Sequence, residues 1–163
     1  KERELGASPT TKLPGATAIE DEIARRIAGG DDAAFCYLDL DNLKKINDAN
    51  GHMAGSRTIQ EVGNALRAST RRTDTVARFG GDEFLIFADE AALPSATALA
   101  ERIRVRIEAI QLPFEGRVLN TTASLGVACY PGHGSDYQKL FSMADAAMYR
   151  AKANGKNRVE VAG

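Results

Sequence analysis

The sequence predicts an α+β fold in which helices pack on a mostly antiparallel sheet. Short apolar runs of strand length alternate along the chain with stretches of helical periodicity, and one pair of expected strands is joined by a tight Gly-Gly turn. A third observation is size, because 163 residues with 44% hydrophobic content bury about 68–70% of their unfolded surface. We therefore expect one domain with one core.

The first half of the chain is expected to contain two helices and three strands. A short helix at 16–28 ends at two glycines, and an apolar run then forms a buried strand at 33–40. Apolar residues spaced three and four apart predict a helix at 57–68. Runs rich in Val, Phe, Leu and Ile predict strands at 75–79 and 83–88.

The second half continues the alternation. A helix is expected where an apolar stripe runs from residue 99 to residue 110, and a long strand is expected at 119–130. A last helix carries a stripe from residue 140 to residue 151, and a strand at 158–161 follows it. Hairpins that alternate with helices in this way are typical of an α+β fold.

The tight turn between the two central strands carries two acids. Gly80 and Gly81 are expected to supply the positive φ angles of a two-residue hairpin, which leaves Asp82 and Glu83 side by side at its tip. Adjacent carboxylates repel each other, and a divalent cation with oxygen ligands, Mg²⁺ or Mn²⁺, offsets that repulsion. An ordinary solvated turn is the simpler interpretation of Gly-Gly-Asp taken alone.

A second acidic site upstream favours the metal interpretation. The apolar run from Ala33 ends in Asp39-Leu40-Asp41, as a buried strand does where it reaches the rim of a sheet. Because side chains alternate along a strand, Asp39 and Asp41 are expected on one face and Leu40 on the other. A strand-end aspartate beside an Asp/Glu pair is the arrangement used for metal-assisted phosphoryl transfer.

Composition narrows the partners and the surroundings. A net charge of −1 argues against a nucleic-acid polymer or an anionic membrane as the main partner, since both require a basic surface. Cys36 and Cys129 each lie in an apolar run, which predicts reduced core thiols and a cytoplasmic location. No apolar stretch approaches the roughly 18 residues of a membrane span, and no signal-peptide core is present, so any membrane attachment is expected to lie outside this fragment.

Several motifs in order resemble the GGDEF family of nucleotide cyclases. The matching segments are RFGGDEF at 78–84, LDLDNLKKIND at 38–48, NGHMAG at 50–55, TASLGVA at 122–128, ADAAMYRAK at 144–152 and GKNR at 155–158. The resemblance implies the palm fold of nucleotide cyclases. It also implies a cyclase domain at 9–163 and, at 1–8, the end of a linker from an upstream signalling domain.

The resemblance implies a complete catalytic site. The implied ligands of two Mg²⁺ or Mn²⁺ ions are Asp39, the carbonyl of Leu40, Asp82 and Glu83. The same three acids form the catalytic set, and Asp82 is the first candidate to accept the proton of the attacking 3′-hydroxyl. The implied phosphate contacts are Asn42, Leu43, Lys44, Lys152 and Lys156. Lys156 stands where the family often has arginine, and it offers a point charge in place of a bidentate fork.

Two residues are implied to read the base. Asn47 matches the guanine-reading asparagine of the family, whereas Ser56 stands where members that use GTP carry an aspartate. A carboxylate only accepts hydrogen bonds, but a serine hydroxyl donates or accepts, so adenine is penalised less. Ser56 therefore resembles the hybrid promiscuous branch, which joins GTP and ATP into cyclic GMP-AMP. We expect that product together with cyclic di-GMP; the alternative is a strict diguanylate cyclase.

Regulation and assembly also follow from the resemblance. Arg71 and Asp74 match the Arg-x-x-Asp site at which relatives bind their cyclic product for inhibition, and either Arg102 or Arg104 is expected to add a contact. The turn at 8–15 only partly matches the family's N-terminal turn, since the leading acid is missing. One nucleotide site cannot join two nucleotides, so a homodimer is expected for catalysis.

Three classes of function stay open. An active dinucleotide cyclase explains all of the motifs, whereas an inactive receptor of cyclic dinucleotides explains only Arg71 and Asp74, and a polymerase or nucleotidyl cyclase of related fold explains only the metal site. The retained acids Asp39, Asp82 and Glu83 disfavour the receptor. The absence of a basic groove disfavours the polymerase.

Overall fold

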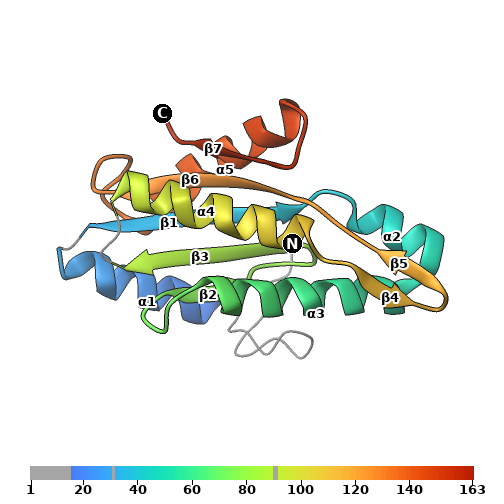
Figure 1. The fold of residues 1–163 in the computed structure, drawn as a ribbon. Coiled ribbons are helices and arrows are strands. Elements are labelled where there is room, and N and C mark those ends of the chain that lie inside the picture. Colours follow the sequence, from blue (N-terminus) through green and yellow to red (C-terminus); the bar gives the residue numbers. More distant parts are fainter. Residues whose placement is uncertain (1–15, 31, 90–91) are drawn as a thin grey trace.

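A computed structural model describes residues 16–30, 32–89 and 92–163 (Figure 1). The expected linker at 1–8 and the turn at 8–15 lie outside the described residues. In chain order the elements are α1 (Ala16–Ala28), β1 (Ala33–Leu40), α2 (Leu43–Asn50), α3 (His52–Ser69), β2 (Thr75–Arg78), β3 (Glu83–Asp89), α4 (Leu93–Glu108), β4 (Leu112–Phe114), β5 (Arg117–Leu119), β6 (Ala123–Tyr130), α5 (Tyr137–Ala153) and β7 (Arg158–Val161).

The central sheet has the strand order β2-β3-β1-β6-β7. Strand β1 is antiparallel to both of its neighbours, β3 and β6, and β3 is antiparallel to β2. Only the pairing of β6 with β7 is parallel among the described strands of this sheet. The expectation of an α+β fold with a mostly antiparallel sheet is confirmed.

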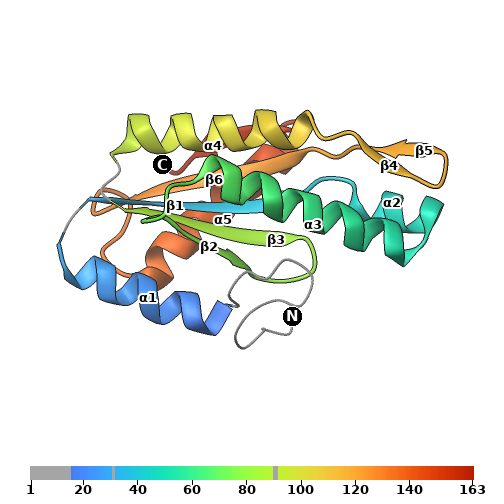
Figure 2. The ribbon, with the colours of Figure 1, turned by 60° about the horizontal axis from the view of Figure 1, so that its bottom comes forward.

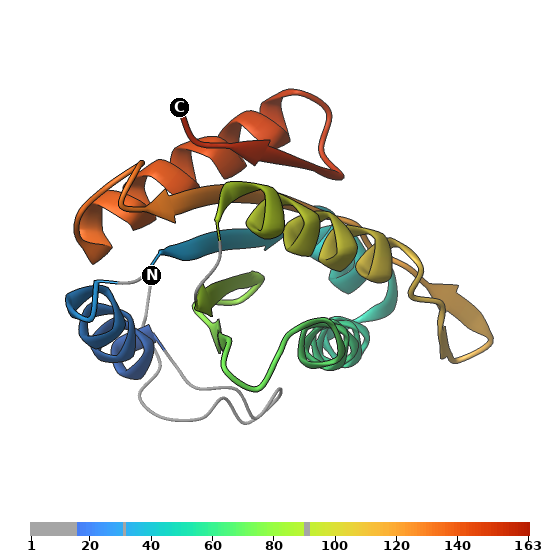
Figure 3. The same cartoon turned by 60° about the vertical axis from the view of Figure 1, so that its left-hand side comes forward.

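Helices cover both faces of the sheet. Figures 2 and 3 show α3 and α4 on one side and α1 and α5 on the other. In β1, Cys36 and Leu38 pack into the core beneath α3 and α4, whereas Phe35 and Tyr37 pack into the core beneath α1 and α5. Because both faces are covered, β1 is a continuous apolar run, and its acids appear only where the strand reaches the rim.

The strand expected at 119–130 is confirmed over 123–130, but its expected start was wrong. Strands β4 and β5 form a separate hairpin that ends at Leu119, and β6 begins only at Ala123. The intervening residues bind the loop that follows β1: the Thr121 hydroxyl donates to Oδ1 of Asn42 at 2.6 Å, and the carbonyl of Thr122 accepts from the amide of Asp41 at 2.9 Å. The second of these bonds extends the β1–β6 pairing by one position, so strand structure is interrupted only between Leu119 and Ala123.

Other boundaries differ for simpler reasons. Helices α3, α4 and α5 begin before their apolar stripes, because their first turns contain polar or small residues outside the periodic pattern. Helix α2 was not expected at all.

Cys36 and Cys129 are free and buried, as expected. No helix in the described ranges is long and apolar enough to cross a bilayer.

Candidate active site

Two strand ends bring three carboxylates together at the rim of the sheet. Asp39 on β1 is the direct pairing partner of Glu83 on β3. The amide of Leu40 donates a hydrogen bond to the carbonyl of Asp82 at 3.0 Å, which ties the hairpin tip to the end of β1. Carboxylate oxygens of Asp39, Asp82 and Glu83 lie within 4.8 Å of one another. The structure therefore gathers the three acids that the sequence assigned to one site.

The turn at the tip of the β2–β3 hairpin differs from the expected one. Strand β2 ends at Arg78 and β3 begins at Glu83, so residues 79–82 form the turn. Neither Gly80 nor Gly81 has a positive φ. The Arg78 guanidinium donates to the carbonyls of these two glycines at 3.0 and 2.9 Å. The prediction of left-handed glycines was wrong, because this arginine holds a wider turn.

Partial burial changes the titration of Asp39. Its side chain is 17% exposed, and burial raises the pKa of this carboxyl to about 7, with the Asp82 charge adding to the rise and the Lys152 charge opposing it. The donor set of carboxylates and a carbonyl consists of oxygen alone, which suits Mg²⁺ or Mn²⁺. Three like charges this close together also favour a cation between them. The residues present therefore fit a divalent metal.

Tyr37 is a member of the site that sequence reasoning missed. The tyrosine is buried, and its hydroxyl is hydrogen-bonded to the carboxylate of Glu83. Its ring packs against Phe79 and Phe141, with centroid separations of 6.0 and 5.0 Å. Burial, together with the negative charge of Glu83, raises the pKa of the Tyr37 hydroxyl, so it stays protonated and donates. In the sequence Tyr37 is only one more apolar position of a buried strand.

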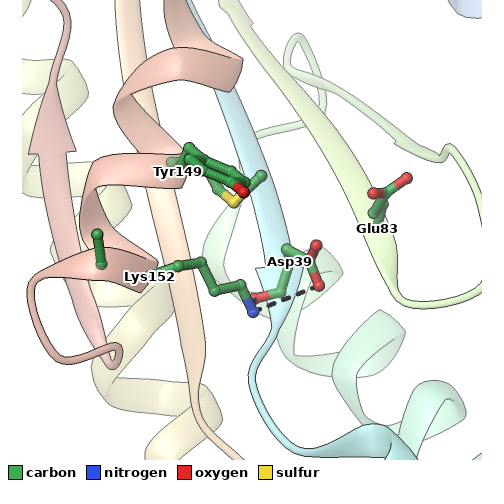
Figure 4. Close-up of a pocket in the computed structure, with 6 residues that line it drawn as sticks. Asp39, Glu83, Tyr149 and Lys152 are labelled. Carbon is green, nitrogen blue, oxygen red and sulfur yellow. Dashed lines mark hydrogen bonds and ion pairs between the residues drawn. The ribbon is translucent and has the colours of Figure 1, made fainter.

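Lys152 reaches the acids from α5. Its ammonium lies 3.5 Å from Oδ1 of Asp39 and 3.0 Å from Oδ1 of Asp41, and it donates to the Leu40 carbonyl at 2.9 Å. Figure 4 shows Lys152 extended toward Asp39, with Tyr149 beside it and Glu83 across the cleft. This cleft has a volume of about 490 Å³. Lys152 thus stands where a phosphate bound near the acids meets a positive charge.

Asp41 lies on the same side of β1 as Asp39, as the alternation predicted, but its environment is different. Its carboxylate is only 4% exposed and accepts from the hydroxyls of Thr122 and Ser124 at 2.6 and 2.7 Å. Burial alone raises the pKa of Asp41, but hydrogen bonds from these hydroxyls and from Lys152 outweigh it and hold the pKa below its usual value. Asp41 is therefore saturated with protein partners.

A second cleft is lined by one of the three acids, Asp82. It has a volume of about 330 Å³, and its lining residues are Leu43, Lys44, Asn47, Asp48, His52, Gly81 and Asp82. Oδ1 of Asn47 is buried and has no hydrogen-bond partner in the described structure. A buried acceptor without a donor is costly. A ligand with N–H groups, such as guanine, would supply the missing donor only after the amide turned from Gly55 toward the cleft.

Gly55 makes room for this asparagine. A Cβ atom at position 55 would lie 1.9 Å from Oδ1 of Asn47, so only glycine permits the observed position of the amide. Ser56, the next residue of α3, is exposed and is not among the residues that line the cleft. The structure therefore places Asn47 in the lining of the cleft but does not place Ser56 there.

The remaining phosphate candidates lie on neighbouring elements. Lys44, in the first turn of α2, forms an exposed ion pair with Asp48 at 2.9 Å. Leu43 is the first residue of α2, whose leading N–H groups lack intrahelical acceptors. The Asn42 side chain is occupied by Thr121. Lys156 lies in the turn after α5, with a φ of 65°. Of the three lysines, Lys152 is the one in contact with the acids.

The expected product site forms a separate cleft of about 320 Å³. Its lining residues are Arg71, Asp74, Ala88, Ser95, Ala98, Leu99 and Arg102. Arg71 pairs with Asp74 at 3.1 Å, and Arg102 donates to the carbonyl of Ser69 at 3.0 Å. Arg104 points elsewhere, where it binds Glu101 and Asn157. The structure thus brings Arg102, and not Arg104, to the pair that the sequence identified.

Comparison with known protein families decides the relationship. The family model described as "Diguanylate cyclase, GGDEF domain" matches residues 9–158. The chain belongs to this family. The GGDEF domain is 39% identical over 158 residues to the diguanylate cyclase DgcP of Pseudomonas aeruginosa, a match that covers 94% of the chain and 23% of DgcP. It is 38% identical over 152 residues to the cyclic di-GMP phosphodiesterase PdeR of Escherichia coli, covering 91% of the chain and 22% of PdeR.

Solved structures agree with this relationship. The GGDEF domain of Pseudomonas aeruginosa TpbB, also called YfiN, superposes with a TM-score of 0.92 at 30% identity, covering 96% of this chain and 94% of that one. The GGDEF domain of Caulobacter crescentus DgcB, solved in complex with c-di-GMP, superposes with a TM-score of 0.89 at 29% identity, covering 99% and 98%. The chain spans less than a quarter of the length of DgcP and PdeR.

Proposed function

We propose that this GGDEF domain is a diguanylate cyclase that condenses two GTP molecules into cyclic di-GMP and releases two pyrophosphates. The observation that carries the proposal is the cluster of Asp39, Asp82 and Glu83, flanked by a cleft with an unsatisfied acceptor on Asn47. An intact acidic cluster is what metal-assisted phosphoryl transfer requires. The proposed domain extends over residues 9–163, with 1–8 as the end of a linker.

Each residue has a role in this proposal. Asp39, the Leu40 carbonyl, Asp82 and Glu83 would hold the divalent cations. Asp82 also accepts the proton of the attacking 3′-hydroxyl. Two Mg²⁺ or Mn²⁺ ions bound there would supply positive charge to the α-phosphate oxygens and to the leaving pyrophosphate. The guanine N–H groups donate to Asn47, and Lys152 meets the phosphates, assisted by Lys44, Lys156 and the backbone at Asn42 and Leu43.

The reaction needs two protomers. The described residues of one domain offer one acidic cluster and one base cleft, so we expect the second nucleotide to come from a second copy. Activity should therefore rise more steeply than linearly with protein concentration while dimers are scarce. A strictly linear dependence in a protein shown to be monomeric would contradict this arrangement.

An inactive receptor is the less favoured alternative. A relative named as a phosphodiesterase is as similar to the chain as the named cyclases are, so family membership alone does not decide activity. The three acids and their shared position favour an active cyclase. We further propose that cyclic di-GMP inhibits the domain by binding between Arg71, Asp74 and Arg102, a proposal supported by the DgcB complex with c-di-GMP.

Ser56 is the reason to consider a second product. The named cyclases among the relatives favour cyclic di-GMP as the main product. Serine in place of an acidic base reader removes a penalty against adenine, so we propose that cyclic GMP-AMP is a minor product when ATP is present. We also propose that the domain lies in the cytoplasm, where both GTP and ATP occur.

Incubation with Mg²⁺ and GTP, ATP or both, followed by chromatography of the products, separates these candidates. We expect cyclic di-GMP from GTP, little product from ATP, and some cyclic GMP-AMP from the mixture. Ser56→Asp should remove the mixed product and leave cyclic di-GMP. If the parent makes only cyclic di-GMP from the mixture, the minor product must be abandoned and the main proposal stands.

A further inference from the structure

Asp41 has an unusually complete set of partners for a carboxylate so close to a candidate active site. Its Oδ1 accepts from the Ser124 hydroxyl at 2.7 Å and from the Lys152 ammonium at 3.0 Å. Its Oδ2 accepts from the Thr122 hydroxyl at 2.6 Å and from the backbone amide of Asn157 at 3.0 Å. The four donors come from β6, from α5 and from the segments that adjoin them.

One of these contacts fixes Lys152 directly. A lysine side chain has many rotamers and loses conformational entropy when it is ordered. Here its ammonium is bound at once by Asp41 and by the Leu40 carbonyl, so the ordering cost is met within the protein before a ligand arrives. The ammonium consequently rests 3.5 Å from Oδ1 of Asp39, at the edge of the acidic cluster.

Another contact fixes the turn that carries Lys156. Lys156 and Asn157 both have a positive φ, 65° and 47°, which is a strained conformation for residues other than glycine. The bond from the Asn157 amide to Asp41 holds this turn against the end of β1. On the other side, the Asn157 side chain accepts from Arg104 at 2.9 Å and donates to Glu108 at 2.7 Å.

We propose that Asp41 is a positioning residue that orients Lys152 and the turn bearing Lys156 to receive a triphosphate. The inference rests on the proposed function, since it assumes a nucleoside triphosphate as the ligand. Asp41 itself touches neither metal nor nucleotide, because all of its strong acceptor directions are used by the protein. Asp41 acts on the ligand only through Lys152 and Lys156.

The test compares nucleotides that differ in the phosphate chain. Binding of 3′-deoxy-GTP and 3′-deoxy-GMP, which lack the attacking hydroxyl and cannot condense, is measured by calorimetry with Mg²⁺ for the wild type and Asp41→Asn. Asparagine keeps the size but loses the charge. We expect the variant to lose about tenfold or more in triphosphate affinity, and less than about twofold in monophosphate affinity. A thermal melt checks the fold.

Asp136→Asn is the matched control. Asp136 also binds α5, since its carboxylate accepts from the amide of Lys139 at 2.8 Å, but it caps the helix end opposite to Lys152. This variant should leave both affinities unchanged. In a Lys152→Ala/Lys156→Ala background, Asp41→Asn should change triphosphate affinity by less than about twofold, because the groups through which it acts are gone.

The outcomes separate the inference from the proposed function. A wild type that binds triphosphate no better than monophosphate refutes the proposed function. A wild type with a triphosphate preference that Asp41→Asn retains, or a variant that loses both affinities equally, overturns the positioning role. If Asp41→Asn does not fold, Thr122→Val decides: a selective loss of about twofold or more supports the role, and an unchanged preference contradicts it.

Discussion

Asp39 and Glu83 are direct cross-strand partners in the pairing of β1 with β3. Like charges in directly opposite positions destabilise a sheet, and Asp82 brings a third carboxylate to the same place. The burial of Asp39 makes the repulsion harder to screen. A divalent cation bound between these carboxylates offsets their repulsion. The pairing of Asp39 with Glu83 therefore favours the metal site that the proposed reaction requires.

Neutral variants of the acids should abolish turnover without unfolding the domain. Asp39→Asn, Asp82→Asn and Glu83→Gln should each lower the rate of cyclic di-GMP formation by about a hundredfold or more, because charge stabilisation of the phosphate oxygens is lost. Thermal stability without metal should stay the same or rise, since like-charge repulsion is relieved. Rates near that of the wild type in all three variants would remove the active-site assignment.

Stability without metal should depend on the titration of Asp39. Its folded-state pKa, about 7, lies above the ordinary value of 3.8, so the folded protein holds this proton more tightly than the unfolded chain. This contribution to the free energy of unfolding is fully present below about pH 4 and is lost as pH rises toward about 7. Urea unfolding with a metal chelator, repeated across this range, measures it.

Asp39→Asn is the control for the pH dependence, because asparagine cannot titrate. The difference in unfolding free energy between wild type and variant should vary with pH over the stated interval and then level off. Added Mg²⁺ should stabilise the wild type increasingly as pH rises through the same interval. A difference that stays constant with pH would show that Asp39 does not carry the raised pKa.

Gly55→Ala should weaken guanine binding. The added Cβ would lie 1.9 Å from Oδ1 of Asn47 and must displace the amide from its observed position. We expect KM for GTP to rise by about tenfold, with a smaller change in kcat, because base binding is affected before chemistry. Gly132→Ala is a suitable control, since a Cβ there meets no atom within 4 Å. Equal kinetics for the two variants would contradict this account of Gly55.

Arg102 and Arg104 should behave differently in product inhibition. Arg102 lines the cleft with Arg71 and Asp74, whereas Arg104 is held by Glu101 and Asn157 outside it. Arg102→Ala and Arg71→Ala should each raise the inhibitory concentration of cyclic di-GMP by about tenfold or more. Arg104→Ala should leave it nearly unchanged. Inhibition that is equal in all of these proteins would exclude this cleft as the product site.

Periodicity and residue type were sufficient for much of the fold. The buried strand at 33–40 was predicted from its unbroken apolar run, and the acids at its end were placed beside the hairpin acids by motif alone. The break between β5 and β6 was not visible in the sequence pattern. It depends on side-chain bonds to Asn42 and the loop after β1, and Thr121 and Asn42 are 79 residues apart in the chain. Local patterns carry no information on such pairings.

The site was predicted only as far as its residues belong to motifs. The roles of Tyr37 and Arg78 were missed, because each acts through one hydrogen-bond geometry that the sequence does not encode locally. The left-handed glycines expected in the turn were wrong for the same reason. The choice between Arg102 and Arg104 required the orientation of α4, which periodicity leaves undetermined.

The most direct test of the central claim is quantification of the products formed from GTP and Mg²⁺ by the wild type and by Asp82→Asn at equal concentration. The wild type should form cyclic di-GMP and pyrophosphate in a ratio of one to two, and Asp82→Asn should form less than about a hundredth of either. A folded, dimeric wild type that yields no cyclic dinucleotide, or an Asp82→Asn variant that matches it, would contradict the account.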